Sequence, residues 1–80
     1  MIRQDIKEVI KICEDFNKNE DRKISHLNII INNDIKFAVE KHDSVKIKYD
    51  TYIVPSLEVK YNDIIINQIF AFDYIEVIKF

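Results

Sequence analysis

The side chains of this 80-residue chain that could carry out chemistry are one cysteine, two histidines and scattered carboxylates. Cys13 would be the nucleophile of a thiol enzyme, with His26 or His42 as its base. However, Cys13 lies in the middle of an apolar helical stripe, where a free cysteine usually packs as a small hydrophobe. A reactive thiol needs an exposed, electropositive setting. We therefore predict a structural role for Cys13.

Metal binding and acid–base catalysis also lack a supporting pattern. Zinc sites cluster three or four ligands, and no cysteine or carboxylate stands at ligand spacing from His26 or His42. His42 and Asp43 are expected to be a solvated pair in a turn. Because the chain has no glycine, neither a P-loop nor a dinucleotide-binding fingerprint can be formed. The prediction is a non-enzymatic protein with no cofactor and no metal.

Lysines on predicted strands give the alternative function, a small β-sheet module that binds nucleic acid. Single strands are bound by positive charge and by stacking on aromatic rings. A nucleic-acid footprint normally carries net positive charge, whereas this chain has a formal net charge of −2. The residues assigned to this alternative are Lys36, Lys46, Lys48, Lys60 and Tyr52.

The element that positions Cys13 is an amphipathic helix predicted over residues 2–16. Its apolar residues recur at intervals of three and four, as on one face of a helix. A polar segment, 17–23, follows and includes asparagines that can take the left-handed conformation that ends a helix. The apolar stripe consists of Ile2, Ile6, Val9, Ile10, Cys13 and Phe16.

From residue 27 the apolar period changes to two, which indicates strands. Pro55 is expected to end the third of these because proline cannot donate to a ladder. The order of elements predicts an α+β fold, with the N-terminal helix packed on a four- to five-stranded antiparallel β-meander. Curled further, this sheet would become a small SH3-like barrel, although no motif of those barrels is present. Strands are predicted at 27–31, 35–39, 45–54 and 57–61, with turns at 32–34, 42–44 and 62–63.

Residues 64–80 depart from this alternation, because twelve of these seventeen residues are apolar and occupy both parities. They form one or two strands, with a break near 67–68 or at Asp73. Either a curled sheet buries them, or they form a protein–protein interface, most simply that of a two-fold homodimer. Phe70 and Phe72 have the same parity and are expected to face the same side as anchors. The predicted interface residues are Tyr52, Val54, Ile69, Phe70, Phe72 and Tyr74.

Length and composition indicate the setting. Eighty residues predict one domain, 1–80, and a lone cysteine fits a reducing cytoplasm. The first residues are too charged for a signal peptide, and no apolar run is long enough for a membrane span. Ile, Lys and Asn, which have A/T-rich codons, supply 34 of the 80 residues, which suggests a low-GC bacterium or its phage or mobile element. No internal repeat is apparent. The predicted function is a small interaction protein, phage- or mobile-element-encoded, that binds another protein, with inhibition as one outcome.

Overall fold

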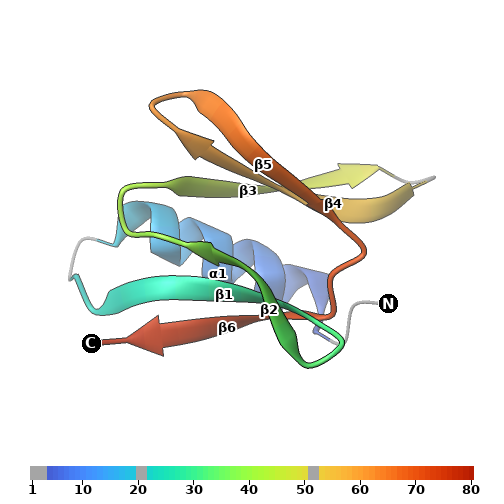
Figure 1. The fold of residues 1–80 in the computed structure, drawn as a ribbon, viewed down its shortest axis with the longest axis horizontal. Coiled ribbons are helices and arrows are strands. Elements are labelled where there is room, and N and C mark those ends of the chain that lie inside the picture. Colours follow the sequence, from blue (N-terminus) through green and yellow to red (C-terminus); the bar gives the residue numbers. More distant parts are fainter. Residues whose placement is uncertain (1–3, 20–21, 51–52) are drawn as a thin grey trace.

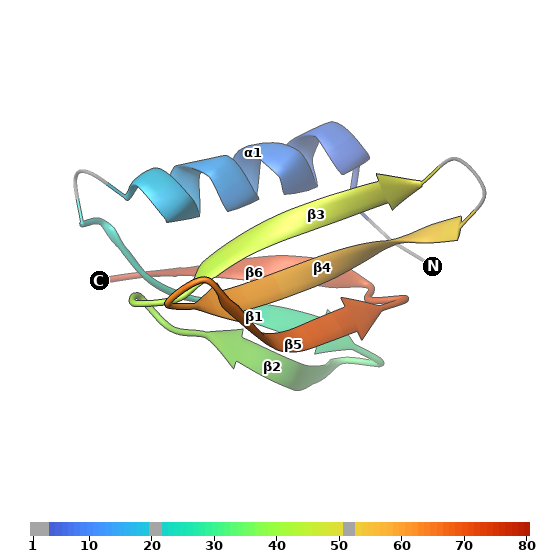
Figure 2. The ribbon, with the colours of Figure 1, turned by 90° about the horizontal axis from the view of Figure 1, so that it is seen from above.

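A computed structural model describes residues 4–19, 22–50 and 53–80, with the backbone alone for 47–50 and 53–55. The described strands form two three-stranded antiparallel sheets, in the orders β2-β1-β6 and β3-β4-β5 (Figure 1). Figure 2 shows the helix along one side of the molecule, beside β3, with β2 and β5 on the opposite side. The elements are α1 (Ile6–Lys18), β1 (Ile24–Ile31), β2 (Asp34–Val39), β3 (Ser44–Asp50), β4 (Ile53–Tyr61), β5 (Ile64–Phe70) and β6 (Tyr74–Lys79).

This architecture confirms the α+β class and the N-terminal helix, but the single meander of four or five strands is wrong. A meander pairs only neighbours in sequence, whereas β1 pairs with both β2 and β6. Residues 64–80 form two strands, because β5 ends at Phe70 and β6 begins at Tyr74. The last strand, β6, can therefore return to pair with the first, β1. No pairing joins the two sheets among the described strands, and the barrel closure considered above is therefore not observed.

Helix α1 begins later than predicted because Asp5 caps it. The Asp5 backbone is extended, and its carboxylate accepts a hydrogen bond from the backbone N–H of Lys7 at 2.7 Å. At the other end, Asn19 takes the left-handed conformation that the polar segment was expected to supply. The stripe faces inward as predicted, with Val9, Cys13 and Phe16 buried and Ile6 and Ile10 half-buried. Ile2 lies outside the described residues.

Pro55 lies inside β4 and does not end a strand, contrary to the prediction. The hairpin between β3 and β4 comes earlier in the chain, so the end of the predicted third strand belongs to β4. The pairing of the two strands is irregular here, because Lys48 lies opposite Ser56 but Asp50 lies opposite Ile53. Proline is tolerated in a strand at such an irregularity, where its missing N–H is not needed by the ladder.

Two tight hairpins use asparagine and aspartate where other proteins use glycine. Asn32 and Asn33 have φ of 53° and 66°, and Asn62 and Asp63 have φ of 50° and 63°. Two successive residues with positive φ are typical of the type I′ turn, whose twist matches that of the flanking strands. The turns predicted at these two places are confirmed.

The two hairpins are one arrangement that occurs twice, 30 residues apart. In each, two residue pairs follow the turn, and then one extra residue bulges the second strand, Lys36 in β2 and Ile66 in β5. The flanking strands match as well, because β6 lies beside β1 as β3 lies beside β4. Few residues are identical at equivalent positions, Leu27 and Leu57 being one pair. The repeat is therefore visible in the structure and not in the sequence.

Two side-chain amides hold the helix region against the inner edges of the two sheets. The Asn17 amide donates to Val45 O at 2.8 Å, and Val45 N–H donates to Asn17 Oδ1 at 2.9 Å. The Gln4 amide makes the same pair of hydrogen bonds with Ile75: it accepts one from Ile75 N–H at 2.8 Å and donates one to Ile75 O at 3.3 Å. Val45 on β3 and Ile75 on β6 are equivalent positions of the repeat. These amides bind the edges of β3 and β6 at one residue each, and β2 and β5 form the other, outer edges of the two sheets.

The hydrophobic core lies between the two sheets and against the helix. Both halves of the repeat contribute residues to this core, and strands of both sheets therefore contain buried residues. Its buried members are Val9, Cys13, Phe16, Leu27, Ile29, Val39, Val45, Leu57, Val59, Ile69, Phe72 and Ile75.

Candidate interaction surface

Most of the exposed large apolar side chains of the described chain lie on the β4–β5 hairpin. Ile64, Ile65 and Ile66 are 67%, 51% and 48% exposed, and Tyr61 is 44% exposed. Phe70, at the end of β5, is 56% exposed. A regular strand on a core alternates between buried and exposed residues, but the bulge at Ile66 interrupts this alternation. Ile64 and Ile65, which are adjacent and precede the bulge, are also both exposed, so the hairpin presents apolar groups on both faces of β5.

The strand β5 is also an outer edge of its sheet, and no described strand pairs with its free side. Residues 64–70 contain no charge and no proline, and isoleucine and phenylalanine make up most of them. Proteins usually protect an open edge with charged residues, proline or bulges. Here only the bulge at Ile66 is present. Such an uncharged edge of high β-propensity pairs readily with another strand.

The structure places the predicted interface residues in different settings. Phe70 is exposed and Tyr74 is half-buried, whereas Ile69 and Phe72 belong to the core. Tyr52 and the side chain of Val54 lie outside the described residues. At this end of β5 the residue available to a partner is therefore Phe70.

The expectation that Phe70 and Phe72 face the same side is wrong. Phe70 is the last residue of β5, and Ala71 has a left-handed φ of 56°. Residues two apart share a face only in a continuous strand, and the chain changes direction at Ala71. The following loop is tied to β1, because Asp73 N–H donates to Ile30 O at 2.8 Å. Phe72, with 0% exposure, is thereby directed into the core.

The predicted interface segment 64–80 included the isoleucines 64–66, but the list of interface residues contained neither these nor Tyr61. Alternation groups Tyr61 with Leu57 and Val59, which are indeed buried. The signal that could have separated them is the position of Tyr61 next to the Asn62-Asp63 turn, because a hairpin tip is where strands leave the core.

The lysines assigned to the nucleic-acid alternative are divided between the two sheets. Lys36 is on β2, whereas Lys46 and Lys60 are on β3 and β4. The Nζ atom of Lys60 is 3.6 Å from Oε1 of Glu58, which neutralises part of its charge. The side chain of Lys48, like Tyr52, lies outside the described part of the chain. The described lysines therefore form no continuous basic face.

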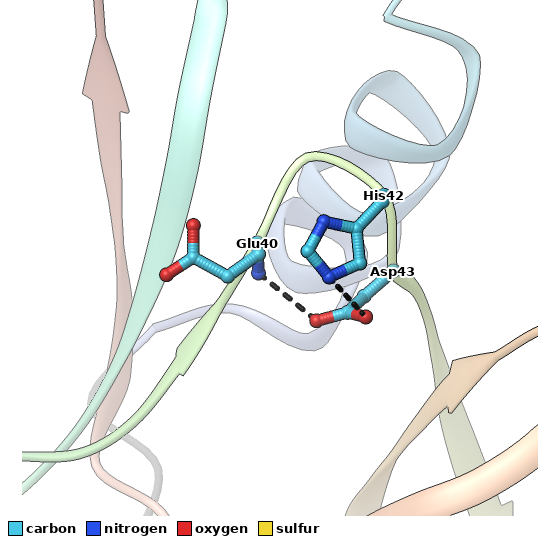
Figure 3. A network of polar contacts seen from close by, with 3 residues as sticks. All are labelled: Glu40, His42 and Asp43. Atoms are coloured by element: carbon cyan, nitrogen blue, oxygen red, sulfur yellow. Dashed lines mark hydrogen bonds and ion pairs between the residues drawn. The ribbon is translucent and has the colours of Figure 1, made fainter.

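His42 and Asp43 stabilise the turn between β2 and β3 (Figure 3). Asp43 Oδ2 accepts a hydrogen bond from Glu40 N–H at 3.1 Å, and Asp43 N–H donates to Glu40 O at 2.9 Å. His42 Nε2 lies 3.5 Å from Asp43 Oδ1, and the rings of His42 and Tyr61 are nearly perpendicular, with centroids 5.0 Å apart. The predicted solvated pair is correct for His42 only, because Asp43 is buried. The pair therefore connects this turn to the tip of the β4–β5 hairpin.

Cys13 is buried in the core, as predicted. Burial, with a smaller contribution from the Glu14 carboxylate, raises the pKa of Cys13 from 9.0 to about 12. The thiol is thus protonated at neutral pH and lacks the thiolate that a nucleophile requires.

Other chemical sites find little support in the described residues. They contain no group of three or more His, Cys, Asp or Glu that could hold a metal ion. A shallow hollow between α1 and β6 is lined by both acids and bases, including Glu8, Asp15, Lys23 and Lys79, and so favours no ligand charge. No helix in the described part of the chain is long and apolar enough to cross a membrane.

Comparison of the chain with protein-family models, with curated proteins and with solved structures found no match. Its function therefore has to be inferred from the surface itself.

Proposed function

We propose that this chain is a non-enzymatic interaction protein that binds another polypeptide through the β4–β5 hairpin. The observation that supports this most is the group of exposed apolar residues, Tyr61 and Ile64–Ile66, on one hairpin. Contiguous exposed apolar groups mark interaction sites because leaving them in water is unfavourable. Phe70 extends the same surface along β5.

Where the polypeptide bound is a different protein, inhibition of that protein is the proposed consequence. A small domain of this kind acts by covering a surface of its partner, since no catalytic group is proposed for it. A reducing cytoplasm is the proposed setting, because the lone cysteine is a free thiol in the core. The abundance of residue types that have A/T-rich codons, namely Ile, Lys and Asn, supports an origin in a low-GC bacterium, or in a phage or mobile element of one.

A photo-crosslinking residue tests the binding surface. Benzoylphenylalanine at position 65, on the hairpin, is compared with the same residue at position 14, an exposed position on α1. In cells that naturally make the chain, we expect a discrete crosslinked adduct from position 65 and none from position 14. Absence of any adduct at position 65, or equal adducts at both positions, would contradict the proposed surface.

A further inference from the structure

The strands β2 and β5 occupy equivalent places in the repeat and have nearly the same exposure. Each is the second strand of a tight hairpin and an outer edge of its sheet. In both, the first three residues are exposed and the sixth is buried, namely Val39 in β2 and Ile69 in β5. The two edges therefore offer the same backbone geometry to a further strand.

The chemistry of the two edges differs at the exposed positions. In β2 the first and third residues are Asp34 and Lys36, whereas in β5 they are Ile64 and Ile66. Charged residues on an edge strand oppose pairing with another strand because pairing would remove their water. The exposed isoleucine between them is common to both edges, at 35 and 65. Thus β2 carries protection against pairing that β5 lacks.

We infer that β5 pairs antiparallel with β5 of a second copy of this chain, joining two β3-β4-β5 sheets into one six-stranded sheet across a two-fold axis. This inference rests on the proposed function and names the partner of the same hairpin. Antiparallel pairing of a strand with its own copy is two-fold symmetric, as in the commonest class of homodimer. Because residues 64–70 carry no charge, every register of this pairing places uncharged side chains opposite one another.

Pairing with a second copy provides hydrogen-bond partners for the backbone of the open edge, which a contact through side chains alone does not. The backbone N–H and C=O groups on the free side of β5 gain ladder partners, as in other cases of strand addition. At the same time the exposed isoleucines and Phe70 gain apolar neighbours across the axis. In the same dimer β2 stays open to water, which its charged residues tolerate.

The repeat supplies a matched pair of variants for the test. Ile65→Lys and Ile35→Lys make the same change at equivalent exposed positions, one on each edge. In sedimentation velocity from low micromolar to near-millimolar concentration, we expect the wild type and Ile35→Lys to dimerise. Ile65→Lys should weaken dimerisation about 100-fold, since each two-fold contact contains the substitution twice at roughly tenfold each. Circular dichroism shows whether each variant folds. If Ile65→Lys does not fold, Ile66→Lys replaces it, because this change gives β5 the lysine that β2 has at the equivalent position, Lys36.

Hydrogen exchange on the wild type gives a readout that needs no variant. The backbone amides on the free side of β5 should exchange more slowly as the protein concentration rises, while the exchange rates of the β2 amides stay unchanged. A wild type that is monomeric at near-millimolar concentration, or a dimer in which β5 amides exchange as fast as those of β2, would overturn the inference. A position-65 adduct with a different protein, and none with a second copy, would also overturn it while leaving the proposed function in place. If position 65 gives no adduct, either with a different protein or with a second copy, both proposals are contradicted.

Discussion

Asn17 makes with Val45 the two hydrogen bonds that a neighbouring strand would make, at 2.8 and 2.9 Å. A single side chain thus satisfies the edge of β3 at Val45 and fixes the last turn of α1 to it. Gln4 repeats this contact at the equivalent residue of β6, so the helix is attached at both ends.

Asn17→Ala should lower the free energy of unfolding by about 1–3 kcal/mol, because two hydrogen bonds are lost at roughly 0.5–1.5 kcal/mol each. Chemical denaturation measures this loss. Lys18→Ala, an exposed neighbour on the same turn, is the control and should change stability by less than about 0.5 kcal/mol. Equal effects of the two changes would show that the amide contact does not hold the helix.

Phe72→Ala should cost about 3–5 kcal/mol, since it removes a fully buried ring and leaves a cavity. In dilute solution, where chains do not associate, Phe70→Ala should change stability by less than about 0.5 kcal/mol because Phe70 is exposed. Thermal unfolding followed by circular dichroism compares the two. Similar losses for both would mean that the chain does not turn at Ala71.

Ala71→Gly should raise the free energy of unfolding by about 1 kcal/mol. The left-handed φ of 56° brings the Ala71 Cβ close to the backbone, and glycine relieves this. The gain is reduced by the greater freedom of glycine in the unfolded chain. The second alanine of the chain gives the control, because Ala38→Gly within β2 should instead destabilise by about 0.5–1 kcal/mol.

The raised pKa of Cys13, about 12 against 9.0, predicts a loss of stability in alkaline solution. Above pH 9 the unfolded chain releases the thiol proton while the folded chain keeps it, so the unfolded state binds fewer protons and stability falls. The contribution is complete below pH 9 and decreases up to about pH 12, by at most about 1.4 kcal/mol per pH unit. Cys13→Ala removes this dependence and isolates it from the titration of lysines and tyrosines. The stability advantage of the wild type over Cys13→Ala at pH 8 should therefore shrink by pH 10.5, and a constant difference would contradict the burial of the thiol.

The features that could be predicted from the sequence are those set by neighbouring residues. The helical stripe through Val9 and Cys13 follows from spacing, and the Asn32-Asn33 and Asn62-Asp63 turns follow from residues that tolerate positive φ. The pairing of β1 with β6 could not be predicted, because it depends on where the chain turns between two apolar strands.

Three departures from prediction have local physical causes. Ala71 has no turn propensity of its own, and its left-handed conformation is imposed by the burial of Phe72 and by the hydrogen bond from Asp73 to β1. Pro55 could remain within a strand only because the opposite strand is irregular there. Ile66 is exposed because of a bulge, which residue alternation does not reveal. The list of predicted interface residues therefore includes the exposed Phe70 but not the exposed isoleucines of the hairpin.

The pairing of β1 with β6 also determines the order in which the chain can fold. Ile29 and Ile75 are paired although 46 residues separate them, whereas β3 pairs with β4 and β4 pairs with β5, which are neighbours in sequence. Closing a long loop before any contact compensates for it slows the search, so local hairpins form first. We expect β1 to keep an open edge until β6 docks, and pulse-labelled hydrogen exchange should protect β4 amides before those of β6. During that interval the folding chain has unpaired apolar edges on both sheets, which makes it most prone to pair with other chains before the last strand is in place.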